Sequence, residues 1–137
     1  MAQHDILNEI TSGHPGFSFE VLPPLKGKSN ATLFDNVKRL MPFGPRYVNI
    51  TTHRSELVYK SVPGGLYERV SERSRPGTVA VAAAIQNRFN IPAVPHIICS
   101  GYSARETEYA LIDLSFLGIN NLLLLRGDKA KHDPRFI

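Results

Sequence analysis

Four consecutive leucines, Leu122 to Leu125, constrain the fold of this chain more than any other feature of its sequence. The run is too short for a membrane span, and it lies between two asparagines and Arg126-Gly127-Asp128. A short apolar run with such borders indicates a strand buried on both faces, as in parallel sheets that helices cover. In α/β folds, ligand sites lie where such strands end. An isolated Arg-Gly-Asp tripeptide is more typical of a surface turn, so the other strand ends have to decide between these interpretations.

The rest of the chain alternates between strand and helix patterns. Runs rich in aromatic and β-branched residues predict further strands, and apolar residues spaced by three or four predict helices. Two S/T-x-x-D/E patterns, at Thr32 and at Ser103, indicate capping boxes that begin helices. The predicted strands are 16–22, 46–51, 93–99 and 122–125, and the predicted helices are 5–12, 32–41, 78–89 and 103–117.

One connection is unusually long. Residues 57–76 separate the second strand from the next helix and carry Pro63-Gly64-Gly65. This segment is predicted to be a long loop, and loops of this length are uncommon unless they are functional. The last residues, 129–137, show no periodic pattern.

The order of elements predicts an α/β fold, with a short leading helix followed by a βαβαβαβ series. Parallel strands require crossover connections, and here a helix supplies each of them. The first strand runs into Pro23-Pro24 rather than into a Gly-x-Gly-x-x-Gly turn. This argues against a dinucleotide-binding Rossmann unit.

Composition and charge narrow the class of protein. With 137 residues, 42% of them hydrophobic, the chain is at most one globular domain. Its net charge of +4 comes from scattered basic residues, which makes nucleic-acid binding a weak hypothesis and fits an anionic small ligand. Cys99 is the single cysteine, which excludes an intrachain disulfide, and the N-terminus lacks the pattern of a secretion signal. We therefore expect a cytoplasmic protein that binds neither nucleic acid nor membrane.

Each predicted strand ends near a side chain that can bind or react: Glu20, Thr51, His96, and the pair Arg126 and Asp128. In a β/α barrel such ends converge on one face, where catalysis takes place. Singly, each has a plainer explanation: a solvated carboxylate, a β-branched strand residue, or a hydrogen-bonded core histidine. Together they favour a site. No spacing of His, Asp and Glu matches a metal centre, so no metal is expected.

Four motifs, in this order and spacing, resemble the methylenetetrahydrofolate reductase family. They are Phe17-Ser18-Phe19-Glu20-x-x-Pro23-Pro24, Tyr47-Val48-Asn49-Ile50-Thr51, Pro95-His96-Ile97-Ile98-Cys99 and Leu125-Arg126-Gly127-Asp128. The family consists of β/α-barrel flavoproteins. They use FAD and a reduced nicotinamide, NADH or NADPH, to convert 5,10-methylenetetrahydrofolate to 5-methyltetrahydrofolate in one-carbon metabolism and methionine biosynthesis. The resemblance therefore implies an oxidoreductase with a folate substrate.

The resemblance also implies roles for single residues. Glu20 occupies the position of the catalytic acid, which assists opening of the folate's five-membered ring to a reactive iminium. Asp128 matches the aspartate beside flavin and folate, where a negative charge stabilises the cationic iminium. The positions that hold FAD are matched by Thr51, His96, Leu125, Arg126, Gly127 and Asp128.

The chain departs from the family's pattern in two places. After the Thr51 position the family typically has a Tyr-Gly-Ala-Gly-Gly-Ser type of loop, whereas this chain has Thr52-His53-Arg54-Ser55-Glu56 and then the long basic connection. Val21 and Leu22 stand where two aromatic residues are usual.

A complete β/α barrel takes about 250 residues. We therefore expect residues 1–137 to be a single partial domain: the N-terminal half of a β/α (TIM) barrel, with the first four βα units and unpaired edges at its first and fourth strands. Such a fragment is expected to be inactive alone, and the full-length barrel is a possible homo-oligomer. Two alternatives are a non-catalytic half-barrel that binds a partner copy or another subunit, and a non-flavin β/α-barrel enzyme acting on pterins or phosphorylated ligands.

Overall fold

The computed structural model describes residues 6–128, so Asp5 of the predicted leading helix and the segment 129–137 lie outside the described residues. The main sheet has the order β1-β2-β5-β6. Its strands are β1 (Phe19–Val21), β2 (Val48–Ile50), β5 (Ala93–Ile98) and β6 (Leu123–Leu125). The helices are α1 (Ile6–Thr11), α2 (Ala31–Leu40), α3 (Thr78–Phe89) and α4 (Ala104–Phe116), with short 3-10 turns η1 (Met41–Phe43) and η2 (Cys99–Gly101).

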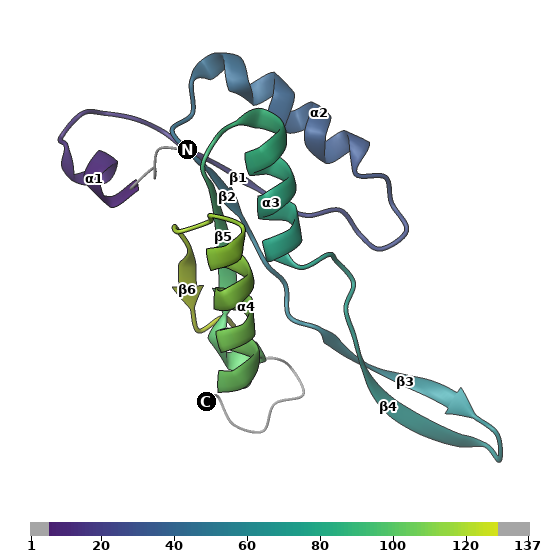
Figure 1. Cartoon of the computed structure of the whole chain (residues 1–137). Helices are drawn as coiled ribbons and strands as arrows, with labels where there is room; N and C mark the ends of the chain where they lie inside the picture. Colours follow the sequence, from purple (N-terminus) through teal and green to yellow (C-terminus); the bar gives the residue numbers. More distant parts are fainter. Residues whose placement is uncertain (1–5, 129–137) are drawn as a thin grey trace.

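The sheet has the predicted parallel topology. All three strand pairs run parallel, and the four strands lie side by side in chain order. The helices α2, α3 and α4 pack on one face of the sheet, and in Figure 1 α4 lies in front of β5. This arrangement confirms the predicted α/β class and is that of a partial β/α barrel, in which helices pack outside a parallel sheet.

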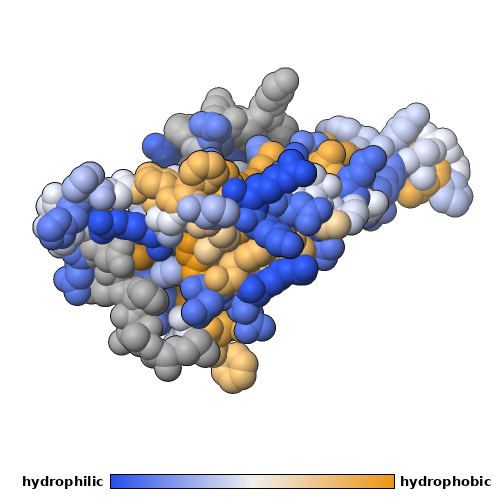
Figure 2. Space-filling view, turned by 90° about the horizontal axis from the view of Figure 1, so that it is seen from above, coloured by the Kyte–Doolittle hydropathy of each residue, from blue (hydrophilic) through white to orange (hydrophobic). Residues whose placement is uncertain are grey.

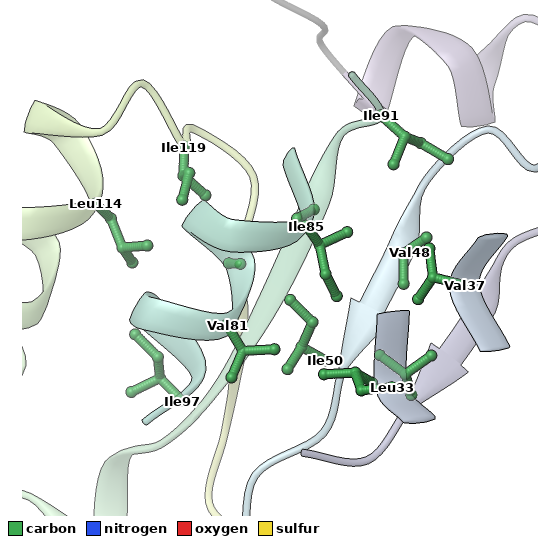
Figure 3. Packing of buried hydrophobic residues seen from close by; sticks show 13 residues of the cluster. Leu33, Val37, Val48, Ile50, Val81, Ile85, Ile91, Ile97, Leu114 and Ile119 are labelled. Carbon is green, nitrogen blue, oxygen red and sulfur yellow. The ribbon is translucent and has the colours of Figure 1, made fainter. Parts of the chain in front are cut away.

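The hydrophobic core lies between the sheet and these helices (Figure 3). In α3, Val81 and Ile85 are buried at the predicted spacing of four, and Ala82 is fully buried, which lets the helix approach the sheet closely. The cluster consists of Val21, Leu33, Val37, Val48, Ile50, Val81, Ala82, Ile85, Ile91, Ala93, Ile97, Leu114 and Ile119.

Helix starts follow local signals only in part. Ser103 begins α4 with the predicted capping box, in which its hydroxyl accepts from the backbone N–H of Glu106 and the Glu106 carboxylate accepts in return. The capping box predicted at Thr32 is wrong, because α2 already begins at Ala31, whose N–H donates to Ser29 Oγ (3.1 Å). Within residues 6–128, no helix has the length and apolar character needed to cross a membrane.

The leucine strand β6 lies at the edge of the described sheet, as expected for the fourth strand of a half-barrel, and in this chain it is not buried on both faces. Leu123 and Leu124 are 46% and 53% exposed. Burial on both faces requires packed elements above and below the strand. Among the described strands, β6 also pairs only with β5, so its other edge is unpaired.

The connection predicted to be a long loop is an antiparallel hairpin, which corrects that prediction. Its strands are β3 (Glu56–Val62) and β4 (Leu66–Glu72), and Pro63-Gly64-Gly65 forms the turn. Gly64 and Gly65 both have positive φ, as three-residue hairpin turns favour. The hairpin projects from the sheet in Figure 1, and in Figure 2 it mixes hydrophilic and hydrophobic residues along its length.

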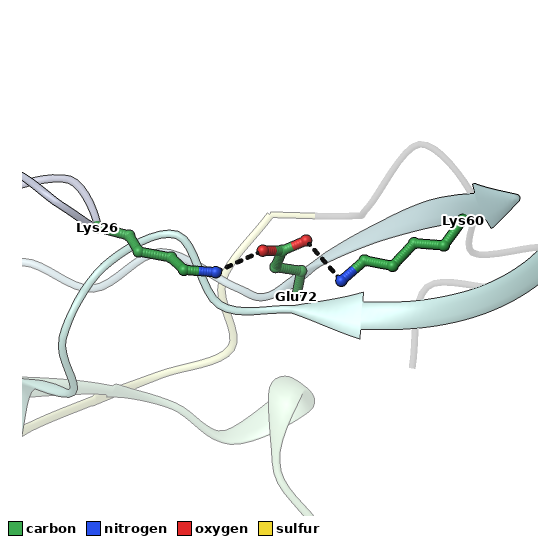
Figure 4. A network of polar contacts seen from close by, with 3 residues as sticks. All are labelled: Lys26, Lys60 and Glu72. Carbon is green, nitrogen blue, oxygen red and sulfur yellow. Dashed lines mark hydrogen bonds and ion pairs between the residues drawn. The ribbon is translucent and has the colours of Figure 1, made fainter.

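Charged groups fix the base of this hairpin to the loop after β1 (Figure 4). Glu72 accepts a hydrogen bond from Lys26 (2.7 Å) and lies 3.5 Å from Lys60. The hydrogen bond from Lys26, together with the charges of both lysines, holds the pKa of Glu72 below its ordinary value. The backbone of Lys26 also donates to the carbonyl of Ser74 (2.7 Å). Because these ion pairs are exposed, they contribute little to the free energy of unfolding. Their role is to set the direction in which the hairpin projects.

The buried face of α3 gives a first prediction. Replacing Ile85, which is fully buried, with Ala is expected to lower the free energy of unfolding by about 2–5 kcal/mol, because a cavity replaces the lost side chain. The same change at Ile112, which is 58% exposed on α4, is expected to cost about 0.5 kcal/mol or less. Urea unfolding of both variants measures the difference. Equal costs would contradict the assignment of the core.

Candidate functional site

The strand register places several polar side chains on the face of the sheet that the helices leave uncovered, which we call the inner face. Side chains alternate along a strand, and the register sets Glu20 beside Asn49 and Asn49 beside Val94. His96, two residues after Val94, therefore shares their face. The amide of Asn49 donates to Ser18 Oγ (3.2 Å), which agrees with this arrangement.

Glu20 lies on β1, one residue before the strand ends, and its side chain is exposed. It borders an open groove of about 520 Å³ between β1 and α2. Partial burial of a carboxyl group raises its pKa and suits a catalytic acid, but the described residues leave Glu20 exposed. The other lining residues are Val21, Leu22, Pro24, Thr32, Leu33, Asn36, Arg39 and Leu40.

His96 is buried in β5, with 6% of its surface exposed. Its backbone carbonyl accepts from Thr78 Oγ1 (2.9 Å), which joins β5 to the start of α3. The side-chain Nε2 is buried and has no hydrogen-bond partner among the residues that the structure describes. The plainer explanation of a hydrogen-bonded core histidine is thus wrong for this atom. Burial lowers the pKa of His96, and the negative charge of Glu20, on the same face, partly opposes this shift.

The carboxyl ends of β2 and β6 hold the other predicted residues. Thr51 follows β2 directly, and its N–H donates to the carbonyl of Val21 (3.0 Å). Leu125 ends β6 beside Ile98 of β5. Gly127 has a φ of 80°, and a Cβ there would lie 2.5 Å from Ile98 Cγ2, so only glycine fits.

The predicted residues thus lie on neighbouring strands of one sheet without forming one cluster, because the register sets Glu20 level with Val94, near the start of β5. Glu20 and His96 lie on the inner face of strands separated only by β2, and Thr51 lies between them in strand order. Arg126 and Asp128 are exposed beyond β6. Because β1 and β6 are the two edges of the described sheet, Glu20 and Asp128 have two strands between them.

Sequence reasoning missed two arginines at the ends of the hairpin. Arg54 donates to the backbone carbonyls of Ser100 and Asp128, and Arg75 donates to the carbonyl of Pro23. The only sequence signal was their place within polar clusters that follow or precede strands. Among residues 6–128, no group of three or more His, Cys, Asp or Glu side chains is arranged to hold a metal.

Gly127 yields a prediction with a matched control. Gly127→Ala is expected to destabilise the chain more than Gly27→Ala, by about 1 kcal/mol or more, because the added methyl group collides with Ile98. Gly27 has nearly the same φ (79°), but a Cβ there meets nothing within 4 Å, so it isolates the cost of backbone strain. Urea unfolding compares the two variants, and equal losses would show that Ile98 moves aside freely.

The lowered pKa of His96 leads to a prediction of how the free energy of unfolding depends on pH. Because its pKa in the folded chain lies below the ordinary 6.5, protons bind the unfolded chain more readily, and stability falls as pH drops through that value. Between about pH 7.5 and about pH 5.5, we expect the free energy of unfolding to decrease less in His96→Gln than in the wild type. His53→Gln, which removes an exposed histidine, is the control.

The pH window separates this effect from that of the carboxylates. Hydrogen bonds lower the pKa of Glu72 and of Glu106 below 4.5, the latter through the backbone and hydroxyl of Ser103. The stability they provide is therefore lost only as pH falls below about 4.5. An unchanged pH dependence in His96→Gln would contradict the assignment to His96.

Comparisons with known proteins agree with the motifs. The family model described as methylenetetrahydrofolate reductase matches residues 5–136. The chain is 27% identical to methylenetetrahydrofolate reductase (NADH) 1 of Arabidopsis thaliana, over 97% of this chain and 20% of that protein. It is 28% identical to 5,10-methylenetetrahydrofolate reductase of Escherichia coli K12, over 93% of this chain and 38% of that protein. The chain thus spans a fifth to two fifths of these curated relatives, and it belongs to the methylenetetrahydrofolate reductase family.

Proposed function

We propose that this chain is part of a flavin-dependent enzyme that reduces 5,10-methylenetetrahydrofolate to 5-methyltetrahydrofolate, with a reduced nicotinamide as electron donor. The relatives carry the name of this reaction, and the plant relative's name specifies NADH. The residues that the family motifs mark lie on the strands of one parallel sheet or directly follow them, and β/α barrels place their sites where such strands end.

The observation that carries the proposal is the shared inner face of Glu20 and His96. An exposed carboxylate and a buried imidazole lie on one face of a family member's sheet, close enough for the charge of Glu20 to act on His96. A buried imidazole nitrogen that has no hydrogen-bond partner among the described residues lowers the stability of the fold. A ligand that bonds to it would account for its presence.

Two features of the structure fit FAD. Nε2 of His96, which has no hydrogen-bond partner among residues 6–128, is a group that a ligand on the inner face would satisfy. Gly127 presents backbone without a side chain at the end of β6, next to the exposed Arg126, whose charge suits the anionic or carbonyl groups of a flavin. FAD, when bound, supplies the hydride chemistry, and the protein supplies position and charge.

Glu20 is the residue to which we assign the proton transfer. Its carboxyl group would donate a proton to a ring nitrogen of the folate, and the C–N bond of the five-membered ring then breaks with its electrons on that nitrogen. The one-carbon unit is left as a cationic iminium on the other nitrogen. Asp128 is assigned the stabilisation of that cation through its negative charge.

The extent of the chain bears on this proposal. The described sheet has four parallel strands with β1 and β6 at its edges, whereas a β/α barrel closes with eight. We propose that residues 1–137 are one partial domain, the first half of a catalytic barrel, and that turnover requires the remaining βα units. The complete polypeptide, meaning this chain with any sequence that its gene adds, is therefore the material for the assays below.

The test separates the two half-reactions. In the complete polypeptide, Glu20→Gln is expected to leave reduction of bound flavin by the nicotinamide unchanged. The same change is expected to slow reduction of methylenetetrahydrofolate by about 100-fold or more, because the amide cannot donate the proton. Stopped-flow absorbance of the flavin measures both steps. Glu68→Gln, on the exposed hairpin strand β4, removes a carboxylate away from the inner face and serves as the control.

Two results would overturn the proposal. Equal loss in both half-reactions would remove the acid role from Glu20. A colourless wild-type protein whose melting temperature does not respond to FAD would favour a non-flavin enzyme or a non-catalytic binding module.

A further inference from the structure

Arg54 connects the ends of three strands of the sheet. It follows β2, and its guanidinium donates from Nη2 to the carbonyl of Ser100 (2.8 Å) and from Nη1 to the carbonyl of Asp128 (3.2 Å). Ser100 lies in η2, directly after β5, and Asp128 follows β6. One side chain therefore holds the segments that leave β5 and β6.

A second contact completes the arrangement around Gly127. The hydroxyl of Ser100 donates to the carbonyl of Arg126. The residues on both sides of Gly127 therefore accept hydrogen bonds from other parts of the chain. The carbonyl of Asp128 accepts from Arg54. The carbonyl of Arg126 accepts from Ser100, whose own carbonyl accepts from Arg54.

Gly127 makes such external contacts necessary. A glycine tolerates positive and negative φ about equally, so it does not fix the direction of the peptide groups that flank it. Here Gly127 is held at a φ of 80° against Ile98. The hydrogen-bonded carbonyl of Arg126 lies in the peptide group before Gly127, and that of Asp128 lies one peptide group beyond the one after it. The two bonds thus hold the segment on both sides of this conformation.

The chemistry requires an arginine rather than any cation. A planar guanidinium offers separate N–H donors in a rigid fork, so its two Nη atoms reach two carbonyls at once. A lysine ammonium is a single point on a flexible chain and cannot hold both carbonyls in the same geometry.

We propose that Arg54 is a positioning residue for the flavin site, which sets the backbone of Arg126-Gly127-Asp128 through the carbonyls of Ser100 and Asp128. This inference rests on the proposed function, because it takes that segment to be part of the cofactor site.

The test compares Arg54→Gln and Arg54→Lys with Arg69→Gln in the complete polypeptide. Arg69, exposed on β4, takes no part in these contacts, and its loss changes the net charge equally. The measurements are the dissociation constant of FAD from flavin fluorescence, hydrogen exchange at the amides of residues 126–128, and the melting temperature.

We expect Arg54→Gln to weaken FAD binding by about tenfold or more, since hydrogen bonds from a charged donor are lost, and to speed exchange in residues 126–128. Arg54→Lys should recover only part of both, and Arg69→Gln should match the wild type. If Arg54→Gln melts too early to be studied, Arg54→Lys carries the same comparison.

Three outcomes would overturn the inference: unchanged exchange at 126–128 in both Arg54 variants, full recovery by lysine, or an equal effect of Arg69→Gln. Weakened FAD binding with unchanged exchange also counts against it, because it would make Arg54 a direct ligand. If the wild type binds no FAD, the proposed function fails, and the exchange data alone decide whether Arg54 positions the segment.

Discussion

The register of the parallel strands is the constraint on which the rest of the structure depends. It sets Val48 and Ile50 against the helices and leaves Glu20, Asn49 and His96 on the opposite face. A shift of β1 by one residue would exchange its two faces and place the carboxylate of Glu20 against the helices. Packing of Ile85 against this sheet stabilises the fold. It also determines which face of the sheet is covered, and hence which side chains remain available to a ligand.

The candidate site also depends on contacts that no element makes by itself. The carboxyl ends of the strands lead into segments of irregular structure, whose conformations the sheet does not determine. Arginines at the two ends of the hairpin hold these segments by their carbonyls, Arg75 after β1 and Arg54 after β5 and β6. Backbone carbonyls are present in every residue, so a guanidinium can hold a segment without restricting which side chains it carries.

Much of the fold could be predicted from local patterns, and the failures have physical reasons. Val81 and Ile85 marked the buried face of α3, and Ser103 with Glu106 marked the start of α4, because these signals act within one or two turns. The hairpin was missed because Val58 and Lys60 lie on one face of it, so the alternation that marks a strand is absent. The exposure of Leu124 depends on which elements lie beside β6, which periodicity does not show.

The site was predicted through motifs rather than through contacts. Motif order marked Glu20, Thr51 and His96, and the register shows how two of them come to share a face. That Nε2 of His96 has no partner in the described part of the chain could not be predicted, because this depends on all the residues around β5. Arg54 was equally hidden, since it binds carbonyls 46 and 74 positions away in the chain.

The pairing of Glu56 with Glu72 at the base of the hairpin has a consequence for how this chain can vary. Paired residues in an antiparallel ladder lie about 5 Å apart, little more than the step between neighbouring residues. The two ends of the hairpin therefore lie close together, and its length can change without moving β2 or α3. Both anchoring arginines, Arg54 and Arg75, lie outside residues 56–72, so a change in the length of the hairpin leaves them in place. The hairpin is a natural position at which to graft or remove a peptide while the inner face keeps its geometry.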